Sequence, residues 1–196
     1  MNVLLILISV LSSYGEVSNE NYIPSAEESL GIAEIYYPIE NFESGITAKP
    51  FGIYISPEAS PIQPERFTGF HTGVDVEVPQ DAEDVWVYAI DDGEVITLEN
   101  VNGYGGVIQL YYPEEDYTAL YGHLDIKSSL VSVGDEILTG DRLALLGDAY
   151  SFETDGERKH LHFSLKPGLD RDFRGYVQTE EELDDWVDPE QFINTF

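Results

Sequence analysis

Hydrophobic and polar residues alternate in short stretches along the chain from residue 46 onward, and turn sequences separate the stretches. Alternation with a period of two is typical of β-strands, whose successive side chains point to opposite faces. The pattern predicts a short strand near residues 52–55 and further strands at 72–78, 85–90, 94–99, 106–112, 118–124, 143–147 and 160–166. Many short strands with Gly-containing turns and no long amphipathic helix indicate an antiparallel all-β domain.

Two histidines lie on one face of the last predicted strand. The alternating sequence of this stretch is His160-Leu161-His162-Phe163-Ser164-Leu165-Lys166. It predicts a half-buried strand that turns two imidazoles to the same side, where they can converge on one metal ion or one reacting atom. Taken alone, such a stretch is more often a surface strand that carries two solvated histidines.

The stretch that begins at His71 alternates in the same way. Valines, Gly73 and the following Pro79 favour a strand over a helix here. His71 and Asp75 are then expected to point the same way, with Gly73 leaving room between them. The remaining histidine of the chain, His123, falls in the predicted strand 118–124.

These residue types suggest a metal site. Two imidazoles, one carboxylate and a water molecule in an open fourth position form a catalytic zinc arrangement. The ligands would be His71, Asp75 and one histidine of the 160/162 pair. Two histidines and a carboxylate also form the facial triad of non-haem Fe(II) oxygenases. Those enzymes usually have the spacing H-x-D, whereas the spacing here is H-x-x-x-D, and the two extra histidines would have no role.

The order of the motifs resembles that of the lysostaphin-type, LytM-like zinc endopeptidases of peptidase family M23, which cut peptide bridges in bacterial peptidoglycan. The motifs are His71-x-x-x-Asp75, Tyr121-Gly122-His123-Leu124 and His160-Leu161-His162-Phe163, with similar turns at 89–95, 102–107, 131–135 and 187–189. The resemblance extends over roughly residues 46 to 192. It implies an antiparallel β-domain with a groove-shaped active site.

The resemblance also implies roles for the site residues. His71, Asp75 and His162 would bind one Zn²⁺ per chain, while His123 and His160 would be catalytic without binding the metal. The implied activity is hydrolysis of peptide cross-links in the cell wall, and the alternative is a non-catalytic module that binds or activates cell-wall hydrolases. The chain departs from the family pattern G-P-H-L-H-F-E, because Arg158-Lys159 precedes the pair and Ser164 follows it.

Composition narrows the range of partners. The 196 residues have a net charge of −29, from 38 acidic and 9 basic side chains. Such an excess of carboxylates argues against nucleic acid and anionic membrane surfaces as partners. There is no cysteine, so disulfides and thiolate metal sites are excluded. The resemblance, not the composition, implies peptidoglycan peptide bridges as the partner, and we expect a monomer.

The N-terminal residues 1–15 contain no charged side chain, and an apolar run at 3–11 precedes small residues. This pattern predicts a secretory signal peptide that is too short to span a bilayer. We therefore expect a secreted, periplasmic or cell-wall-associated protein that is not inserted in the membrane after cleavage. Residues 16–45 are expected to be a polar linker or an inhibitory prosegment, and 46–196 the peptidase domain, with a short helical extension at its C-terminal end.

Overall fold

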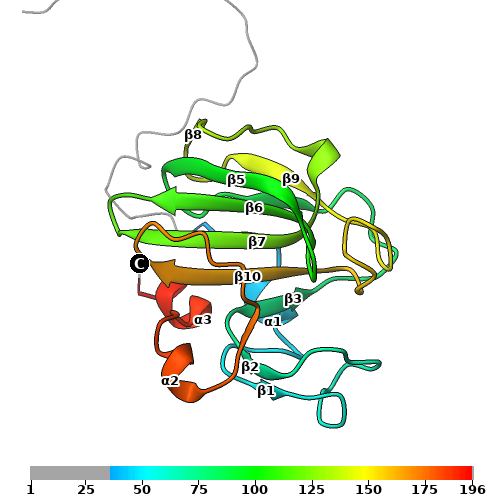
Figure 1. Ribbon diagram of the computed structural model, residues 1–196. Coiled ribbons are helices and arrows are strands. Elements are labelled where there is room, and N and C mark those ends of the chain that lie inside the picture. The colour runs from blue at the N-terminus through cyan, green and yellow to red at the C-terminus, as the bar shows by residue number, and fades with distance from the viewer. Residues whose placement is uncertain (1–35, 196) are drawn as a thin grey trace, which may run out of the picture. The chain divides into compact units, whose positions relative to one another are not determined.

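Strands dominate the computed structural model, which describes residues 36–195 (Figure 1). The strands are β1 (Tyr54–Ile55), β2 (Gly69–His71), β3 (Val74–Glu77), β4 (Trp86–Tyr88), β5 (Gly93–Val101), β6 (Gly105–Tyr112), β7 (Tyr117–Asp125), β8 (Glu136–Ile137), β9 (Arg142–Leu146), β10 (His160–Pro167) and β11 (Tyr176–Val177). The helices are α1 (Phe42–Gly45), a 3₁₀ turn (Ile126–Ser128), α2 (Glu180–Leu183) and α3 (Pro189–Ile193). No helix in the described range is long and apolar enough to cross a membrane.

The strands form two antiparallel sheets. The larger has eight strands, with the central order β3-β10-β7-β6-β5-β8; β9 pairs with β7, and β4 pairs with β9. The smaller contains three strands in the order β1-β2-β11, and lies next to α2 in Figure 1. The predicted all-β antiparallel domain with short C-terminal helices is therefore confirmed.

Strand β10 lies between β3 and β7 in the large sheet. Its apolar side chains face the core, where Phe163 packs against Tyr121 and Phe42 with ring centroids 5.1 and 6.0 Å apart. The polar face of β10 is buried too, with His160 and His162 only 2% and 3% exposed. A half-buried strand was expected, and the structure differs because other segments of the chain cover the polar face.

The segment after β10 provides much of this cover. It folds back over the polar face of the sheet, where the Gln109 amide donates a hydrogen bond to the Asp172 carbonyl and the Thr118 hydroxyl donates one to the Gly168 carbonyl. Phe173 packs there against a small second cluster of buried side chains. The face of β10 that carries His160 and His162 therefore forms the base of an enclosed site.

The predicted strand 72–78 is interrupted near its start. His71 ends β2 in the small sheet, the chain bends at Thr72 and Gly73, and Asp75 lies in β3 of the large sheet. The glycine permits the crossing, because a Cβ at residue 73 would lie 2.4 Å from the Phe163 carbonyl oxygen and 3.0 Å from His162 Nε2. The prediction that His71 and Asp75 share one face of a single strand is wrong, although their side chains still converge.

The folded unit begins before residue 46. Ile39 and Phe42 are 1% and 2% exposed and belong to the main core, and the Tyr88 amide donates to the Pro38 carbonyl. The stretch assigned to a linker or prosegment therefore contributes its last residues to the β-domain. The predicted signal peptide and the rest of that stretch, up to residue 35, lie outside the described residues.

Candidate metal centre and catalytic site

The three predicted ligands meet where the two sheets approach each other. The Asp75 Oδ1 atom lies 3.2 Å from His71 Nε2 and 3.1 Å from His162 Nδ1, and those two nitrogens lie 3.1 Å apart. All three residues are buried. Three donor atoms at nearly equal separations form a triangle that one small cation can cap.

The dimensions of this triangle suit zinc. Tetrahedral zinc with bonds of about 2.0–2.1 Å to nitrogen and oxygen places neighbouring ligand atoms about 3.3 Å apart. The three measured separations lie close to that value. The donor set of two imidazoles and one carboxylate also matches catalytic zinc sites, which keep a fourth position open for water. These residues therefore fit the metal that the sequence motifs imply.

The outer ring nitrogens of both histidine ligands have partners. His71 Nδ1 lies 3.3 Å from the Pro50 carbonyl oxygen, and His162 Nε2 lies 3.2 Å from the Tyr104 hydroxyl. Donation of an N–H to either partner leaves the inner nitrogen unprotonated, which is the form that binds metal. Burial raises the pKa of Tyr104 and so keeps its phenol neutral.

The carboxylate of Asp75 has different neighbours at its two oxygens. Oδ1 faces the two histidine nitrogens, whereas Oδ2 accepts a hydrogen bond of 2.9 Å from the Arg158 guanidinium. Burial alone would raise the pKa of Asp75, but the combined effects of His160, His71 and His162 lower the pKa well below its usual value. Asp75 is therefore ionised at neutral pH.

The two remaining histidines lie together beside the ligands. The rings of His123 and His160 have centroids 4.2 Å apart, and His160 Nε2 lies 3.4 Å from Asp75 Oδ2. The Nδ1 atom of His160 is 2.9 Å from the Arg158 carbonyl oxygen. A carbonyl can only accept, so Nδ1 carries the proton and Nε2 keeps its lone pair toward the site.

His123 has an unusual backbone. Its φ angle is +66°, a left-handed conformation that is uncommon for a residue other than glycine. The side chain is buried, and its Nδ1 atom has no hydrogen-bond partner among the described residues. Burial lowers the pKa of His123 to about 3 and holds the pKa of His160 well below its usual value, so both rings are neutral at pH 7.

A cavity of about 310 Å³ opens over this centre. Its lining includes Asp75, His123, His160 and His162, together with four aromatic side chains, Phe67, Tyr104, Phe173 and Tyr176. We call this cavity the groove. The lining also includes the charged side chains of Lys49, Glu157 and Arg158, so the groove offers both apolar surface and polar groups to a ligand.

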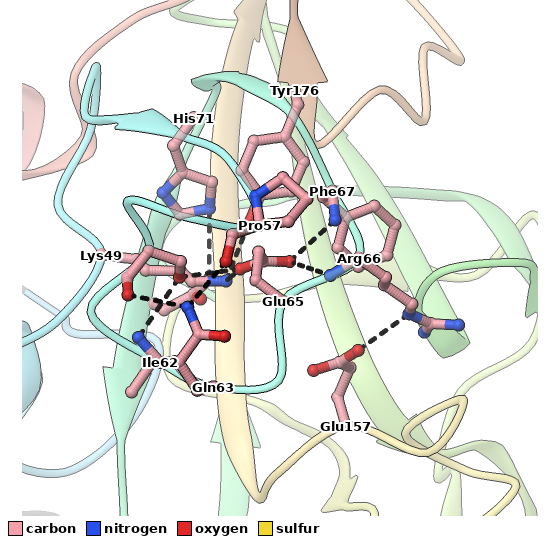
Figure 2. Close-up of polar contacts among 12 residues, drawn as sticks. Lys49, Pro57, Ile62, Gln63, Glu65, Arg66, Phe67, His71, Glu157 and Tyr176 are labelled. Atoms are coloured by element: carbon pink, nitrogen blue, oxygen red, sulfur yellow. Dashed lines mark hydrogen bonds and ion pairs between the residues drawn. The ribbon is translucent and has the colours of Figure 1, made fainter.

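A buried ion pair supports the wall next to His71 (Figure 2). Lys49 Nζ lies 2.7 Å from Glu65 Oε2 and donates a hydrogen bond of 3.1 Å to the Tyr176 hydroxyl. The Tyr176 ring packs against His71 at 5.2 Å and stacks on Phe67 at 5.4 Å. This cluster fixes the ring of one ligand from outside the metal centre.

A second group of charges joins the two loops at the rim of the groove. Arg66, in the loop before β2, pairs with Asp155 and Glu157, in the loop before β10, at 2.8 and 2.9 Å. The Arg66 side chain is 48% exposed, so solvent screens these pairs and their contribution to stability is small. Figure 2 shows the Arg66–Glu157 contact.

Sequence comparison identifies the family. Residues 69–172, more than half of the chain, match the family model described as Peptidase family M23. The chain belongs to peptidase family M23. The matched segment contains His71, Asp75, His123 and the 160/162 pair. A search of curated protein sequences found no match.

Several solved structures share the fold. The catalytic domain of the antimicrobial peptidase lysostaphin from Staphylococcus simulans is 23% identical, with a TM-score of 0.52 over 74% of this chain and 89% of that domain. LytU is 27% identical, with a TM-score of 0.54 over 80% of this chain and 89% of LytU. Cbpa from L. salivarius REN is 19% identical, with a TM-score of 0.56 over 83% and 96% of the two chains.

The structure adds site residues that sequence analysis did not single out. Tyr104 was not among the predicted site residues, yet its hydroxyl contacts His162. Arg158 was noted only as a departure from the family motif, and Lys49 and Tyr176 were not considered. Their contacts join segments far apart in the chain, and motif spacing carries no signal for them.

Proposed function

We propose that this M23 protein is an exported zinc metalloendopeptidase that hydrolyses peptide cross-links of bacterial cell-wall peptidoglycan. The observation that carries the proposal is the triangle of donor atoms from His71, Asp75 and His162, with two neutral histidines beside it. In this proposal one zinc ion binds per chain, and His123 and His160 are the catalytic residues.

The protein residues would divide the work as follows. A bound zinc ion would polarise the scissile carbonyl and lower the pKa of a bound water molecule. His160 presents an unprotonated Nε2 to the site, so it is suited to accept the proton of the attacking water. His123 lies against His160 with an unpaired Nδ1, and is suited to bind the developing oxyanion or to pass the proton on.

The choice of substrate rests on family membership and on the groove. The motifs resemble those of enzymes that cut peptidoglycan bridges, and the groove combines aromatic walls with polar and charged groups that a peptide segment could contact. The predicted signal peptide supports an exported protein that meets its substrate outside the cytoplasm. The net charge of −29 would disfavour polyanionic partners. We propose that the protein acts as a monomer, because the groove and all five site residues belong to one chain.

Digestion of purified peptidoglycans with different bridge chemistries, followed by mass spectrometry of the fragments, tests this function. Cleavage within bridges that requires zinc and stops with chelator is the expected result. A folded, zinc-loaded protein that releases no fragment from any peptidoglycan would instead support a non-catalytic module. Iron in place of zinc, together with oxygen uptake, would support the oxygenase alternative.

Alanine variants separate the proposed roles of the histidines. Replacement of His71 or His162 should abolish zinc binding and activity together. Replacement of His123 or His160 should preserve zinc while lowering turnover by about 10²–10⁴-fold, the usual contribution of acid–base groups. Zinc content by elemental analysis and turnover on peptidoglycan give the two readouts. Loss of zinc in His160→Ala but not in His162→Ala would reverse the assignment within the pair.

A further inference from the structure

Arg158 is a buried cation that contacts a proposed metal ligand. The residue is only 7% exposed. Its Nη2 atom donates to Asp75 Oδ2 at 2.9 Å, and its Nε atom lies 2.9 Å from both oxygens of Glu77. One guanidinium thus joins two carboxylates of the same strand. A buried guanidinium needs such partners, because an unpaired buried charge is very costly.

The pairing of the strands explains why these three groups meet. Asp75 and Glu77 are two residues apart on β3, so their side chains share one face. Strand β10 runs antiparallel to β3, with His162 opposite Asp75 and His160 opposite Glu77. Arg158 lies two residues before His160, at the end of β3 where Glu77 lies. Its long side chain can then reach back along the strand to Asp75.

The two carboxylate oxygens of Asp75 have different partners. Oδ1 lies at the ligand nitrogens of His71 and His162, whereas Oδ2 is bound by Arg158 and faces His160. A carboxylate with both oxygens free can bind a cation through one or both of them. A guanidinium is always protonated and only donates hydrogen bonds, so it competes with a cation for Oδ2 at any pH.

We propose that Arg158 is a positioning residue that keeps Asp75 a single-oxygen ligand, and that Glu77 holds the guanidinium in place for this purpose. The proposal rests on the zinc site of the proposed function. A second oxygen from Asp75 would occupy coordination space that the attacking water or the substrate carbonyl needs. Glu77 also offsets the positive charge of Arg158, which would otherwise repel the cation at close range.

The visible absorption of the cobalt-substituted protein tests whether Asp75 binds the metal through one oxygen or through both. Tetrahedral Co²⁺ absorbs more strongly than Co²⁺ with more ligands, so the spectrum reports coordination number independently of activity. We expect Arg158→Gln to bind Co²⁺ but to lose most of the visible absorption of the wild type, because Asp75 then binds through both oxygens. Arg158→Lys, which restores one cationic donor, should recover part of the intensity.

Lys159→Gln is the matched control. Lys159 is the neighbouring residue, its side chain is as buried as that of Arg158, and it pairs with the exposed Asp148 at 3.3 Å rather than with a ligand. This variant should keep the wild-type cobalt spectrum, although it also loses a buried charge. Circular dichroism of each variant establishes that it is folded before the spectra are compared.

The outcomes are distinguishable. An Arg158→Gln spectrum identical to that of the wild type would overturn this inference while leaving the zinc peptidase intact. Equal loss of intensity in Lys159→Gln would also overturn it, because the effect would then be one of general destabilisation. Failure of Arg158→Gln to fold, with Arg158→Lys folded and spectrally unchanged, would assign Arg158 a purely structural role. A wild-type protein that binds neither Zn²⁺ nor Co²⁺ would overturn the proposed function itself.

Discussion

The buried neutral ring of His123 predicts how the metal-free protein responds to acid. Burial lowers its pKa from the usual 6.5 to about 3. Between these values the unfolded chain takes up a proton at His123 and the folded chain does not, so the free energy of unfolding must fall as the pH falls. Integrated from pH 7 to pH 4, this one group costs about 3 kcal/mol of stability.

Comparison with His123→Asn isolates that contribution. Asparagine tolerates the left-handed backbone at φ +66° better than most residues, and it does not titrate. Urea unfolding of both proteins in the presence of chelator, at pH values from about 7 to about 4, gives the free energies of unfolding. We expect the wild type to lose about 3 kcal/mol more than the variant over this range. Other acid-sensitive groups are common to both proteins and largely cancel in the difference.

The comparison can fail in a clear way. If the two stability curves run parallel from pH 7 to pH 4, the ring of His123 is hydrated or protonated in the folded state, and the reasoning from burial is refuted. Above pH 7 the titration contributes almost nothing, so any difference there reports the packing of the side chain alone. The same unfolding data therefore separate the contribution of His123 protonation from that of the packing of its side chain.

Two further changes test other parts of the structure. Tyr104→Phe removes the hydroxyl that contacts His162 Nε2 and should weaken zinc binding about 10–100-fold, as is usual when the partner of a ligand histidine is lost; chelator competition measures this, and unchanged affinity would contradict it. A chain that starts at residue 46 lacks Ile39 and Phe42 and should lose about 5 kcal/mol or more of stability relative to one that starts at residue 36, as urea unfolding of the two chains would measure.

The sequence predicted the long strands because their packing has a simple periodicity. The alternation in β10 and in β5 to β7 gives these strands within a few residues. The short strands β2, β8 and β11 have two or three residues each, too few for any period to appear, and their partners define them. Their existence depends on tertiary contacts, which local sequence patterns do not contain.

The candidate site likewise combines residues that the sequence predicts with contacts that only the folded chain shows. The five histidine and aspartate positions follow from motif spacing. Four of them line the groove, and His71 contacts two of those four. The prediction that His71 and Asp75 lie on one face of a single strand was wrong. A spacing of four residues fits a single strand as well as a chain that crosses from one sheet to the other. The contact of Arg158 with Asp75 spans 83 residues and that of Tyr104 with His162 spans 58, so only the folded chain reveals them.

The crossing between sheets has a consequence for the metal-free protein. His71 belongs to the small sheet, while Asp75 and His162 belong to the large one, so a shared ion would act as a crosslink between two layers. Without the ion, one link between the strands β1, β2 and β11 and the large sheet is lost, and local opening becomes easier. Amide hydrogen exchange should therefore accelerate in these three strands when zinc is removed, while the centre of the large sheet remains protected.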